Sequence, residues 1–296
     1  MSLTIGVDVG GTKVAAGVVD EEGRILERIG RLTPARDQVK TAETICEVIV
    51  ELAGRHDVAA VGLGAAGFVD ESRATVRFAP NLAWREEPLK RRVEDMVGLP
   101  VVVENDANAG AWGEARFGAG RGEENLVCVT IGTGIGGGLI LGGRLYRGRW
   151  GMGGEVGHFR VVPDGRLCGC GNRGCWERYA SGSALGLEAK ALGMTESGAQ
   201  ITEAAAAGRR DALTAFGVVG SWIGQGLADL AALLDPGCFV IGGGVSAAGD
   251  ILLLPVREAF ATRLTGRAHR TLAEIRLAEL GPDAGLVGAA DLARSG

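Results

Sequence analysis

Three cysteines lie within eight residues of the segment CGCGNRGCWE, residues 168–177, in a chain that has six cysteines altogether. Thiols at this spacing form a disulfide or bind a metal, and a tetrahedral zinc ion needs four ligands. Histidine is scarce, with three in the chain, and His158 lies ten residues before Cys168. We therefore expect a structural zinc site made by His158, Cys168, Cys170 and Cys175. The alternative is three unligated thiols on a glycine-rich loop.

A second chemical segment, DVGGTK at residues 8–13, lies between two apolar runs. It contains an acid, two glycines, a hydroxyl and an amine, namely Asp8, Gly10, Gly11, Thr12 and Lys13. Backbone N–H groups in such a turn can bind phosphate, and the acid can approach Mg²⁺. The alternative is a hairpin turn that binds no ligand.

Two further glycine segments follow apolar runs, GTGIGGG at 132–138 and GGGVS at 242–246. The first satisfies G-x-G-x-x-G, but its glycines lead into another strand and not into a helix, so it does not predict a dinucleotide fold. We expect it to bind nucleotide phosphate through Thr133 and Gly134. In the second, Gly242, Gly243 and Gly244 would let an adenine ring lie on the backbone, although a strand-to-helix turn explains the same glycines.

Charge and composition exclude several classes of partner. The net charge is −5, the pI is about 5.4, and there is no Lys/Arg-rich run, which argues against binding to nucleic acid or to an anionic membrane. The N-terminus has no basic flank before an apolar stretch, and no segment has the roughly 18 uninterrupted apolar residues of a membrane span. We expect a cytoplasmic protein that acts on a small neutral or anionic metabolite.

The elements that must position these residues alternate between strands and helices. Apolar runs predict a β-meander, and a helical stripe and further strands follow it. The expected strands are 3–9, 14–19, 25–29, 58–63 and 101–103, and the expected helices are 38–53 and about 87–97. This order indicates an α/β fold.

The same pattern then begins again with strands expected at 126–131, 139–141 and from Leu145. Helices are expected between about 183 and 234, and a strand at 238–241. A meander with a glycine loop occurs twice, which predicts two lobes built alike. We expect a small α/β lobe at 1–110 and a large α/β lobe at 111–284, with the final helix, about 285–296, packed back on the first lobe.

The motifs DVGGTK, ENDAN, GTGIGGG, EVGH and CxCGxxGCxE, in this order along the chain, resemble the ROK family of sugar kinases. Within that family the sequence is most similar to the actinobacterial-type glucokinases. The resemblance implies a two-lobed actin and hexokinase-like (ribonuclease H-like) ATPase fold with a duplicated β-meander and a zinc-binding loop. It also implies transfer of the γ-phosphate of ATP to the 6-hydroxyl of glucose, with Mg²⁺, structural Zn²⁺ and a homodimer or homotetramer.

The resemblance further assigns a sugar site, with Asp106 as the catalytic base. The expected sugar contacts are Ala66, Gly67, Asn105, Asp106, Glu155, His158 and Glu177. The residues alone favour another interpretation of Asn105 and Asp106, as the N-cap of a helix. Glu155 and Glu177 can likewise be solvated surface acids.

The sequence departs from the family pattern in places. Residues 64–67, which include the expected contacts Ala66 and Gly67, read GAAG where many members have a proline-glycine pair. Gly110 and Trp112 replace residues that are more often small or aliphatic. Alternative functions are a kinase for fructose, mannose or an N-acetylhexosamine, and a sugar-sensing regulator. The acidic chain argues against a DNA-binding regulator.

Overall fold

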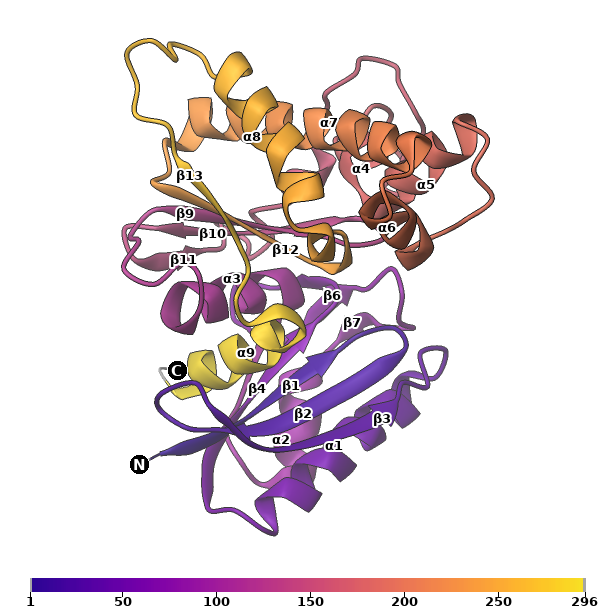
Figure 1. Ribbon diagram of the computed structural model, residues 1–296. Helices are drawn as coiled ribbons and strands as arrows, with labels where there is room; N and C mark the ends of the chain where they lie inside the picture. The colour runs from indigo at the N-terminus through magenta and orange to yellow at the C-terminus, as the bar shows by residue number, and fades with distance from the viewer. Residues whose placement is uncertain (1, 295–296) are drawn as a thin grey trace. The chain divides into compact units, whose positions relative to one another are not determined.

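The computed structural model describes residues 2–294, and the chain forms two compact units (Figure 1). Unit 1 comprises Met1–Gly122, Gly138–Gly154 and Glu279–Gly296, and unit 2 comprises Glu123–Gly137 and Glu155–Ala278. The boundary expected after residue 110 falls inside helix α3, Asp106–Phe117, because that helix packs along its whole length in unit 1. The chain first changes unit after this helix, at residues 122–123, and later at 137–138 within a strand, at 154–155 and at 278–279.

Unit 1 contains a five-stranded sheet with the order β3-β2-β1-β4-β8. Its strands are β1 (Leu3–Val9), β2 (Lys13–Val19), β3 (Ile25–Leu32), β4 (Val58–Ala65) and β8 (Val101–Asn105). The first three strands form an antiparallel meander, and β4 and β8 extend it in parallel to β1. Helices α1 (Gln38–Ala53) and α2 (Leu89–Val97) pack their apolar stripes in the same core, since residues such as Ile45, Ile49 and Val93 are fully buried.

A small second sheet in unit 1 was not expected from the sequence. It consists of β5 (Phe68–Val69), β6 (Val76–Phe78) and β7 (Arg85–Glu87). These strands have two or three residues each, which is too short for a period-2 pattern to stand out. A turn at residues 70–75 joins β5 to β6.

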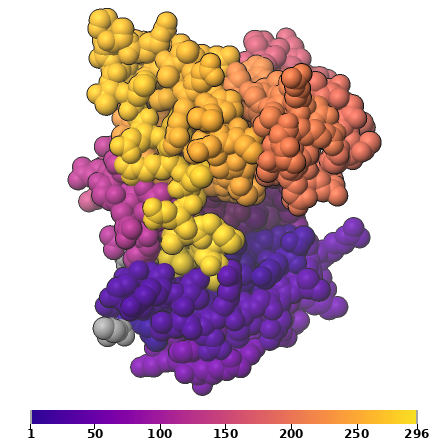
Figure 2. All heavy atoms as spheres, in the orientation of Figure 1, coloured from indigo at the N-terminus to yellow at the C-terminus, as the bar shows by residue number. Residues whose placement is uncertain are grey.

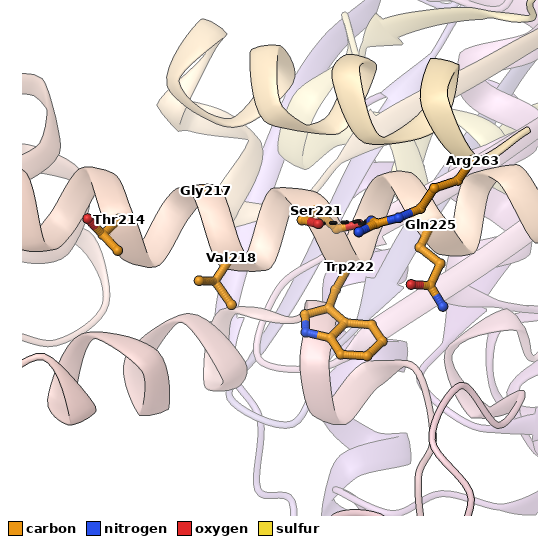
Figure 3. A pocket seen from close by; sticks show the side chains of 7 residues that line it. All are labelled: Thr214, Gly217, Val218, Ser221, Trp222, Gln225 and Arg263. Carbon is orange, nitrogen blue, oxygen red and sulfur yellow. Dashed lines mark hydrogen bonds between the residues drawn. The ribbon is translucent and has the colours of Figure 1, made fainter.

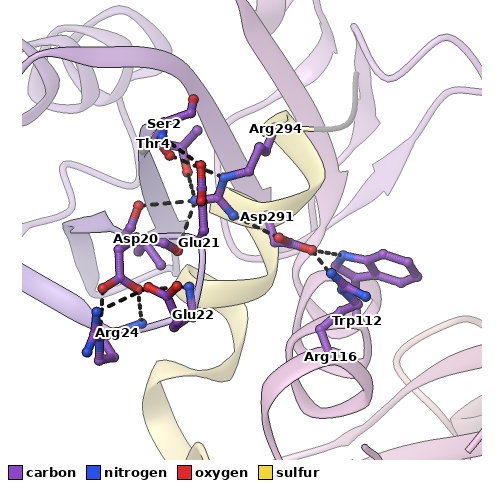
Figure 4. Close-up of polar contacts among 11 residues, drawn as sticks. Ser2, Thr4, Asp20, Glu21, Glu22, Arg24, Trp112, Arg116, Asp291 and Arg294 are labelled. Carbon is purple, nitrogen blue, oxygen red and sulfur yellow. Dashed lines mark hydrogen bonds and ion pairs between the residues drawn. The ribbon is translucent and has the colours of Figure 1, made fainter. Parts of the chain in front are cut away.

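Helix α9 (Ala284–Arg294) is the last element of unit 1 and packs against α3 through glycines. A Cβ atom on Gly288 would overlap the carbonyl of Ala109, so the two helices approach closely only because glycine is present. The C-terminal end of α9 is held by polar contacts, in which Arg294 donates to backbone oxygens of Val19 and Asp20, and Trp112 donates to Asp291 (Figure 4). In Figure 2 the yellow atoms of this helix lie directly against the indigo N-terminal strands.

The other five-stranded sheet has the order β11-β10-β9-β12-β13, which repeats the strand order of the β3-β2-β1-β4-β8 sheet. Its strands are β9 (Leu126–Ile131), β10 (Ile135–Leu141), β11 (Arg144–Tyr146), β12 (Cys238–Gly242) and β13 (Glu274–Leu277). In unit 2, β12 pairs in parallel with both β9 and β13. The division between the units falls within β10, between Gly137 and Gly138. The expected duplication of the meander is confirmed.

The helices of unit 2 centre on α7. They are α4 (Glu177–Ala180), α5 (Gly182–Ala191), α6 (Ala199–Ala206), α7 (Arg210–Leu234) and α8 (Asp250–Arg263), and short 3₁₀ helices are η1 (Val156–His158) and η2 (Gly244–Ala248), with η3 (Gly281–Asp283) in unit 1. By length and composition α7 would suit a membrane span, with a mean hydropathy of 1.3, but half of that window is buried inside the fold. Gly220 and Gly224 let it pack closely on α8, which is typical of a core helix.

A shallow groove of about 600 Å³ opens along the outer side of α7 (Figure 3). Its lining residues are Thr214, Gly217, Val218, Ser221, Trp222, Gln225 and Arg263. The Arg263 guanidinium there donates to the Ser221 hydroxyl and carbonyl oxygen, both at 2.8 Å. None of the residues expected to do chemistry lines this groove.

Candidate functional site

Two carboxylates of unit 1 lie at the ends of β1 and β8, which flank β4 in the sheet. Asp8 lies near the end of β1, and Asp106 is the first residue of α3, directly after β8. A Cβ atom on Gly285 would be 3.6 Å from the Asp8 carboxyl carbon and 3.8 Å from the Asp106 carbonyl oxygen, so α9 closes this corner. Burial, and after it the charge of Asp106, raises the pKa of Asp8 to about 6. Such a pair of acids can bind a cation or hold a hydroxyl group.

Asn105 is the N-cap of α3, as the helix-cap interpretation predicted. Its Oδ1 accepts a hydrogen bond from the backbone N–H of Asn108 at 3.0 Å. Its Nδ2 donates to the carbonyl oxygen of Gly67 at 3.1 Å and to Asp106 Oδ1 at 3.1 Å. The structure thus brings together three of the expected sugar contacts, and the cap function belongs to Asn105 and not to Asp106.

The DVGGTK segment forms the tight turn between β1 and β2. The Gly10 N–H donates to the carbonyl of Lys13 at 3.0 Å, so this donor is used inside the turn and is not available to a phosphate. Thr33 supports the turn, since its hydroxyl donates to the Gly10 carbonyl at 2.8 Å. Thr12 and Lys13 are exposed at the tip. The donors that this turn can offer to a ligand therefore come after Gly10.

The other two glycine loops lie together in unit 2. The loop at 132–134 joins β9 to β10 and is held by the start of α5, where the Gly182 N–H donates to the Gly132 carbonyl at 2.8 Å and the Ser183 hydroxyl donates to the Thr133 carbonyl at 2.6 Å. Gly243 has a φ of 84° and lies on the backbone of Ile131, where any side chain would collide. The expected phosphate loop and adenine loop are thus neighbours.

Glu177 joins the cysteine-rich loop to the glycine loop. Its Oε2 accepts a hydrogen bond from the backbone N–H of Ile135 at 3.0 Å. A Cβ atom on Gly134 would overlap this carboxylate, so Gly134 must be glycine for Glu177 to lie there. The sequence did not predict the role of the Ile135 N–H, because a backbone donor leaves no mark in the residue types.

The four expected metal ligands converge in unit 2, with their donor atoms all within 4.8 Å of one another. Cys170 Sγ lies 3.6 Å from Cys175 Sγ, and Cys168 Sγ lies 3.7 Å from His158 Nδ1. A tetrahedral ion with Zn–S bonds of about 2.3 Å separates its ligand atoms by roughly 3.7 Å. The sulfur–sulfur distance excludes a disulfide, and both the donor set and its spacing fit zinc.

The thiols of this cluster affect each other's ionisation. Burial and the neighbouring thiols raise the pKa of Cys175 to about 12, and burial also raises the pKa of Cys168. The pKa of Cys170 is lowered: burial opposes the change, but the backbone N–H of Asn172 and the other two thiols stabilise the thiolate more strongly. Three thiolates can therefore coexist here only with a compensating cation.

Glu155 and Glu177 both lie beside this cluster. Glu155 Oε2 is 4.0 Å from His158 Nε2, the ring nitrogen opposite the one that faces Cys168. Glu177 Oε1 is 3.5 Å from Cys168 Sγ. Desolvation raises the pKa of Glu155, His158 opposes this shift, and the charge of Glu177 adds to it. Two acids next to this cluster can bind adjacent hydroxyl groups.

The comparisons with known proteins show the family of the chain. The ROK family model matches residues 4–295, and the chain belongs to the ROK family. The chain is 51% identical to a glucokinase from Streptomyces coelicolor, over 99% of this chain and 98% of that protein. It is 33% identical to an N-acetylmannosamine kinase from Yersinia pseudotuberculosis, over 100% of this chain and 99% of that protein.

A similar solved structure is that of a ROK family glucokinase from Streptomyces griseus in complex with glucose and AMPPNP. It has 53% sequence identity and a TM-score of 0.91, and covers 100% of both chains. The expected α/β fold of the actin and hexokinase-like type is confirmed, as is the resemblance to ROK sugar kinases.

Proposed function

We propose that this protein is an ATP-dependent glucokinase, which transfers the γ-phosphate of ATP to the 6-hydroxyl of glucose. The observation that carries the proposal is the 53% identity and 0.91 TM-score, over the whole chain, to a glucokinase structure with glucose and AMPPNP. The motif residues expected to bind glucose and nucleotide form two clusters in this fold, one in each unit.

In this proposal Asp106 is the catalytic base. A sugar hydroxyl is a weak nucleophile, so catalysis depends on aligning it and accepting its proton while the phosphoryl group transfers. Asp106 is held by Asn105 and by the Ala107 N–H at 2.9 Å, which fixes its carboxylate. Asn105, Gly67 and Ala66 would bind the sugar from unit 1, and Glu155, His158 and Glu177 would bind it from unit 2.

The nucleotide would use the three glycine segments. Gly11, Thr12 and Lys13 follow the internally bonded Gly10 and are the groups we assign to phosphate in the first turn. Thr133 and Gly134 would bind phosphate in the second loop, and Gly242, Gly243 and Gly244 would line the adenine. Asp8 would approach the magnesium ion that accompanies ATP, since a cation offsets the repulsion between the Asp8 and Asp106 carboxylates.

Zinc would be held by His158, Cys168, Cys170 and Cys175 as a structural ion. What supports this is that the four donor atoms lie within 4.8 Å of one another, and that two of their pairs, at 3.6 and 3.7 Å, have the spacing of a tetrahedral zinc site. The ion would neutralise the thiolates and stiffen the loop that carries Glu155 and Glu177 at its two ends. We further propose a cytoplasmic location and a homodimer or homotetramer.

The experiment that tests the function is a coupled ADP-release assay with a panel of sugars and donors. We expect the highest kcat/KM with glucose and ATP. The relative with the name N-acetylmannosamine kinase makes an N-acetylhexosamine the main competing substrate. A higher kcat/KM with N-acetylmannosamine, N-acetylglucosamine, fructose or mannose would contradict the choice of glucose and leave the kinase class intact. No ADP release with any sugar would contradict both.

A further inference from the structure

We infer that Glu104, paired with Arg73 and Arg147, positions Asn105 and Asp106 for catalysis. The inference rests on the proposed function, because it concerns the residues assigned there to the sugar. Glu104 is the first residue of the ENDAN motif, and the sequence indicated functions only for the two residues that follow it.

The Glu104 carboxylate lies beneath the junction of β8 and α3. The residue is 1% exposed. Its Oε1 accepts a hydrogen bond from the backbone N–H of Asn105 at 2.9 Å and another from Asn108 Nδ2 at 3.1 Å. The backbone of Asn105 and the first turn of α3 are thus bonded to one buried charge.

Two guanidinium groups neutralise this charge through the other oxygen. Glu104 Oε2 forms ion pairs with Arg73 Nε at 3.1 Å and with Arg147 Nε at 2.8 Å. Arg73 and Arg147 come from separate loops, and the Arg147 side chain is only 11% exposed. A carboxylate buried this deeply is stable only while it is paired, so the three side chains form one unit, which we call the Glu104 triad.

Arg147 also fixes the turn at residues 70–75. Its Nη2 donates to the Asp70 carbonyl at 2.8 Å, and its Nη1 donates to the Glu71 carbonyl at 3.1 Å. The Asp70 carboxylate accepts from the N–H groups of Ala74 and Thr75, and these bonds lower its pKa, although burial acts in the opposite direction. The turn is therefore held by hydrogen bonds from both sides, and it contains a residue in the left-handed region.

That left-handed residue is Arg73 of the triad itself, with a φ of 56°. Its carbonyl oxygen accepts the Val103 N–H at 3.1 Å, so the turn is bonded to β8 two residues before Asn105. Backbone strain and a backbone hydrogen bond thus fix Arg73 against the strand that delivers Asn105 and Asp106.

The triad also anchors the segment that precedes Glu155. The Arg147 carbonyl accepts the Gly153 N–H at 2.9 Å, and Gly151 lies so close to Asp70 that a Cβ atom there would collide with its backbone. Glu155 follows Gly154, the last residue of this part of unit 1. The Glu104 triad is thus bonded to the backbone at Asn105 and at Gly153, two residues before Glu155.

Glu87 provides a matched control in the same unit. It is 0% exposed and is also paired with an arginine, Arg92, and with Gln38, and these three lie on β7, α2 and α1 and not at the junction of β8 and α3. Glu104→Gln and Glu87→Gln each remove one buried negative charge and keep the side-chain shape. Both should lower stability, and only the first should disturb the sugar residues.

The test compares wild type, Glu104→Gln and Glu87→Gln. The values of kcat and of the KM for glucose and for ATP are measured at a temperature well below melting, and Tm is measured separately. We expect Glu104→Gln to lower kcat at least about tenfold and to raise the glucose KM several-fold, with the ATP KM within about twofold, since small displacements of reacting groups have large kinetic effects. Glu87→Gln should leave kcat and both KM values unchanged, and it should lower Tm by about as much as Glu104→Gln does. A Glu104→Gln variant with a lowered Tm and normal kinetics would overturn the inference.

Two additions keep the inference testable under other outcomes. If Glu104→Gln does not fold, Arg147→Lys is measured in its place. This variant keeps the positive charge but loses the paired hydrogen bonds to the carbonyl oxygens of residues 70 and 71. An unchanged kcat and glucose KM in Arg147→Lys would overturn the inference. The side-chain amide NMR signals of Asn105 and Asn108 should shift in Glu104→Gln and not in Glu87→Gln. This readout needs no activity, so an inactive wild type would contradict the proposed function while the signals still test the triad.

Discussion

At the scale of single residues, the structure separates roles that adjacent positions could have shared. Asn105 caps α3 through its side chain, and Asp106 follows as the first helical residue. The cap can therefore not explain an acid at position 106. An acid there lies close to Asp8, and this repulsion is one cause of the raised pKa of Asp8. A like-charged pair is destabilising, which is typical of residues kept for function.

Asp106→Asn tests the base directly. The change keeps the shape of the side chain and leaves the Asn105 cap in place, so the fold and the metal content should not change. If Asp106 accepts the proton, kcat should fall by about 10² to 10⁴-fold with little change in glucose affinity. Steady-state kinetics and calorimetric glucose titration measure the two quantities. A kcat near that of wild type would show that Asp106 is not the base.

Asp8→Asn should stabilise the ligand-free protein at neutral pH. The pKa of Asp8 is raised from 3.8 to about 6, so between these values the native state binds the proton more tightly than the unfolded chain. The contribution of Asp8 to the stability of the wild-type protein therefore falls as the pH rises from about 4 to 6, and Asp8→Asn lacks this contribution. We expect the variant to melt a few degrees higher at pH 7.5 and equally at pH 4.

The control for this prediction is Asp95→Asn, which changes an acid whose side chain is 71% exposed on α2. Its melting temperature should follow that of wild type across the same pH range. If Asp8→Asn melts below wild type at pH 7.5, the carboxylate stabilises the fold and the repulsion inferred here is not the dominant effect.

At the scale of elements, the sequence predicted what periodicity and turn residues encode. Strand β1, helix α1 and strand β9 match the expected ranges 3–9, 38–53 and 126–131, since each has a regular apolar pattern between clear turn signals. Helix α8 was not predicted, because Pro255 lies inside it and its apolar stripe is weak. Strand β13 was missed because it has four residues, which are too few for its alternation of charged and apolar side chains to stand out.

The candidate site was predictable to the same degree. Residues that are neighbours in a motif, such as Asn105 and Asp106, could be found because the motif itself is local. The partners of Glu104 could not, since Arg73 and Arg147 are far from it in the chain and meet it only after two loops have folded. The Ile135 N–H is a backbone donor and has no sequence signal at all.

The loop from His158 to Cys175 gives the prediction at this scale. Its β pairing is limited to isolated bridges, Arg160 with Cys175 and Leu167 with Arg173, and its other backbone hydrogen bonds form turns. An ion that joins His158 to the three cysteines would add a cross-link to this loop. Cys170→Ser should lower the zinc content and Tm, and dialysis of wild type against a strong chelator should lower Tm in the same way. Elemental analysis and calorimetry measure both.

A suitable control for the zinc prediction is Cys46→Ser, which changes a buried cysteine of unit 1 outside the cluster. Its zinc content should equal that of wild type, whatever its effect on stability. Absence of zinc from native protein purified without chelator would contradict the structural ion, and so would a Tm that does not respond to its removal.

At the scale of the whole molecule, the chain passes between its two units four times. The passages lie at 122–123, 137–138, 154–155 and 278–279, and three of them have glycine at the junction. Glu114 fixes the unit 1 side of two passages, since its carboxylate accepts backbone N–H groups of Ala119, Glu279 and Leu280. The proposed sugar contacts are therefore divided between the two units.

This division predicts where glucose should protect the backbone. If the sugar is bound by residues of both units, saturating glucose should slow hydrogen exchange around 66–67 and 105–108 in unit 1, and around 155–158 and 177 in unit 2. Mass spectrometry of peptides resolves these segments, with an equal concentration of glycerol as the control for a general solvent effect. The outer groove of α7 should show no change. Protection confined to one unit would contradict the assignment of the other unit's residues to the sugar.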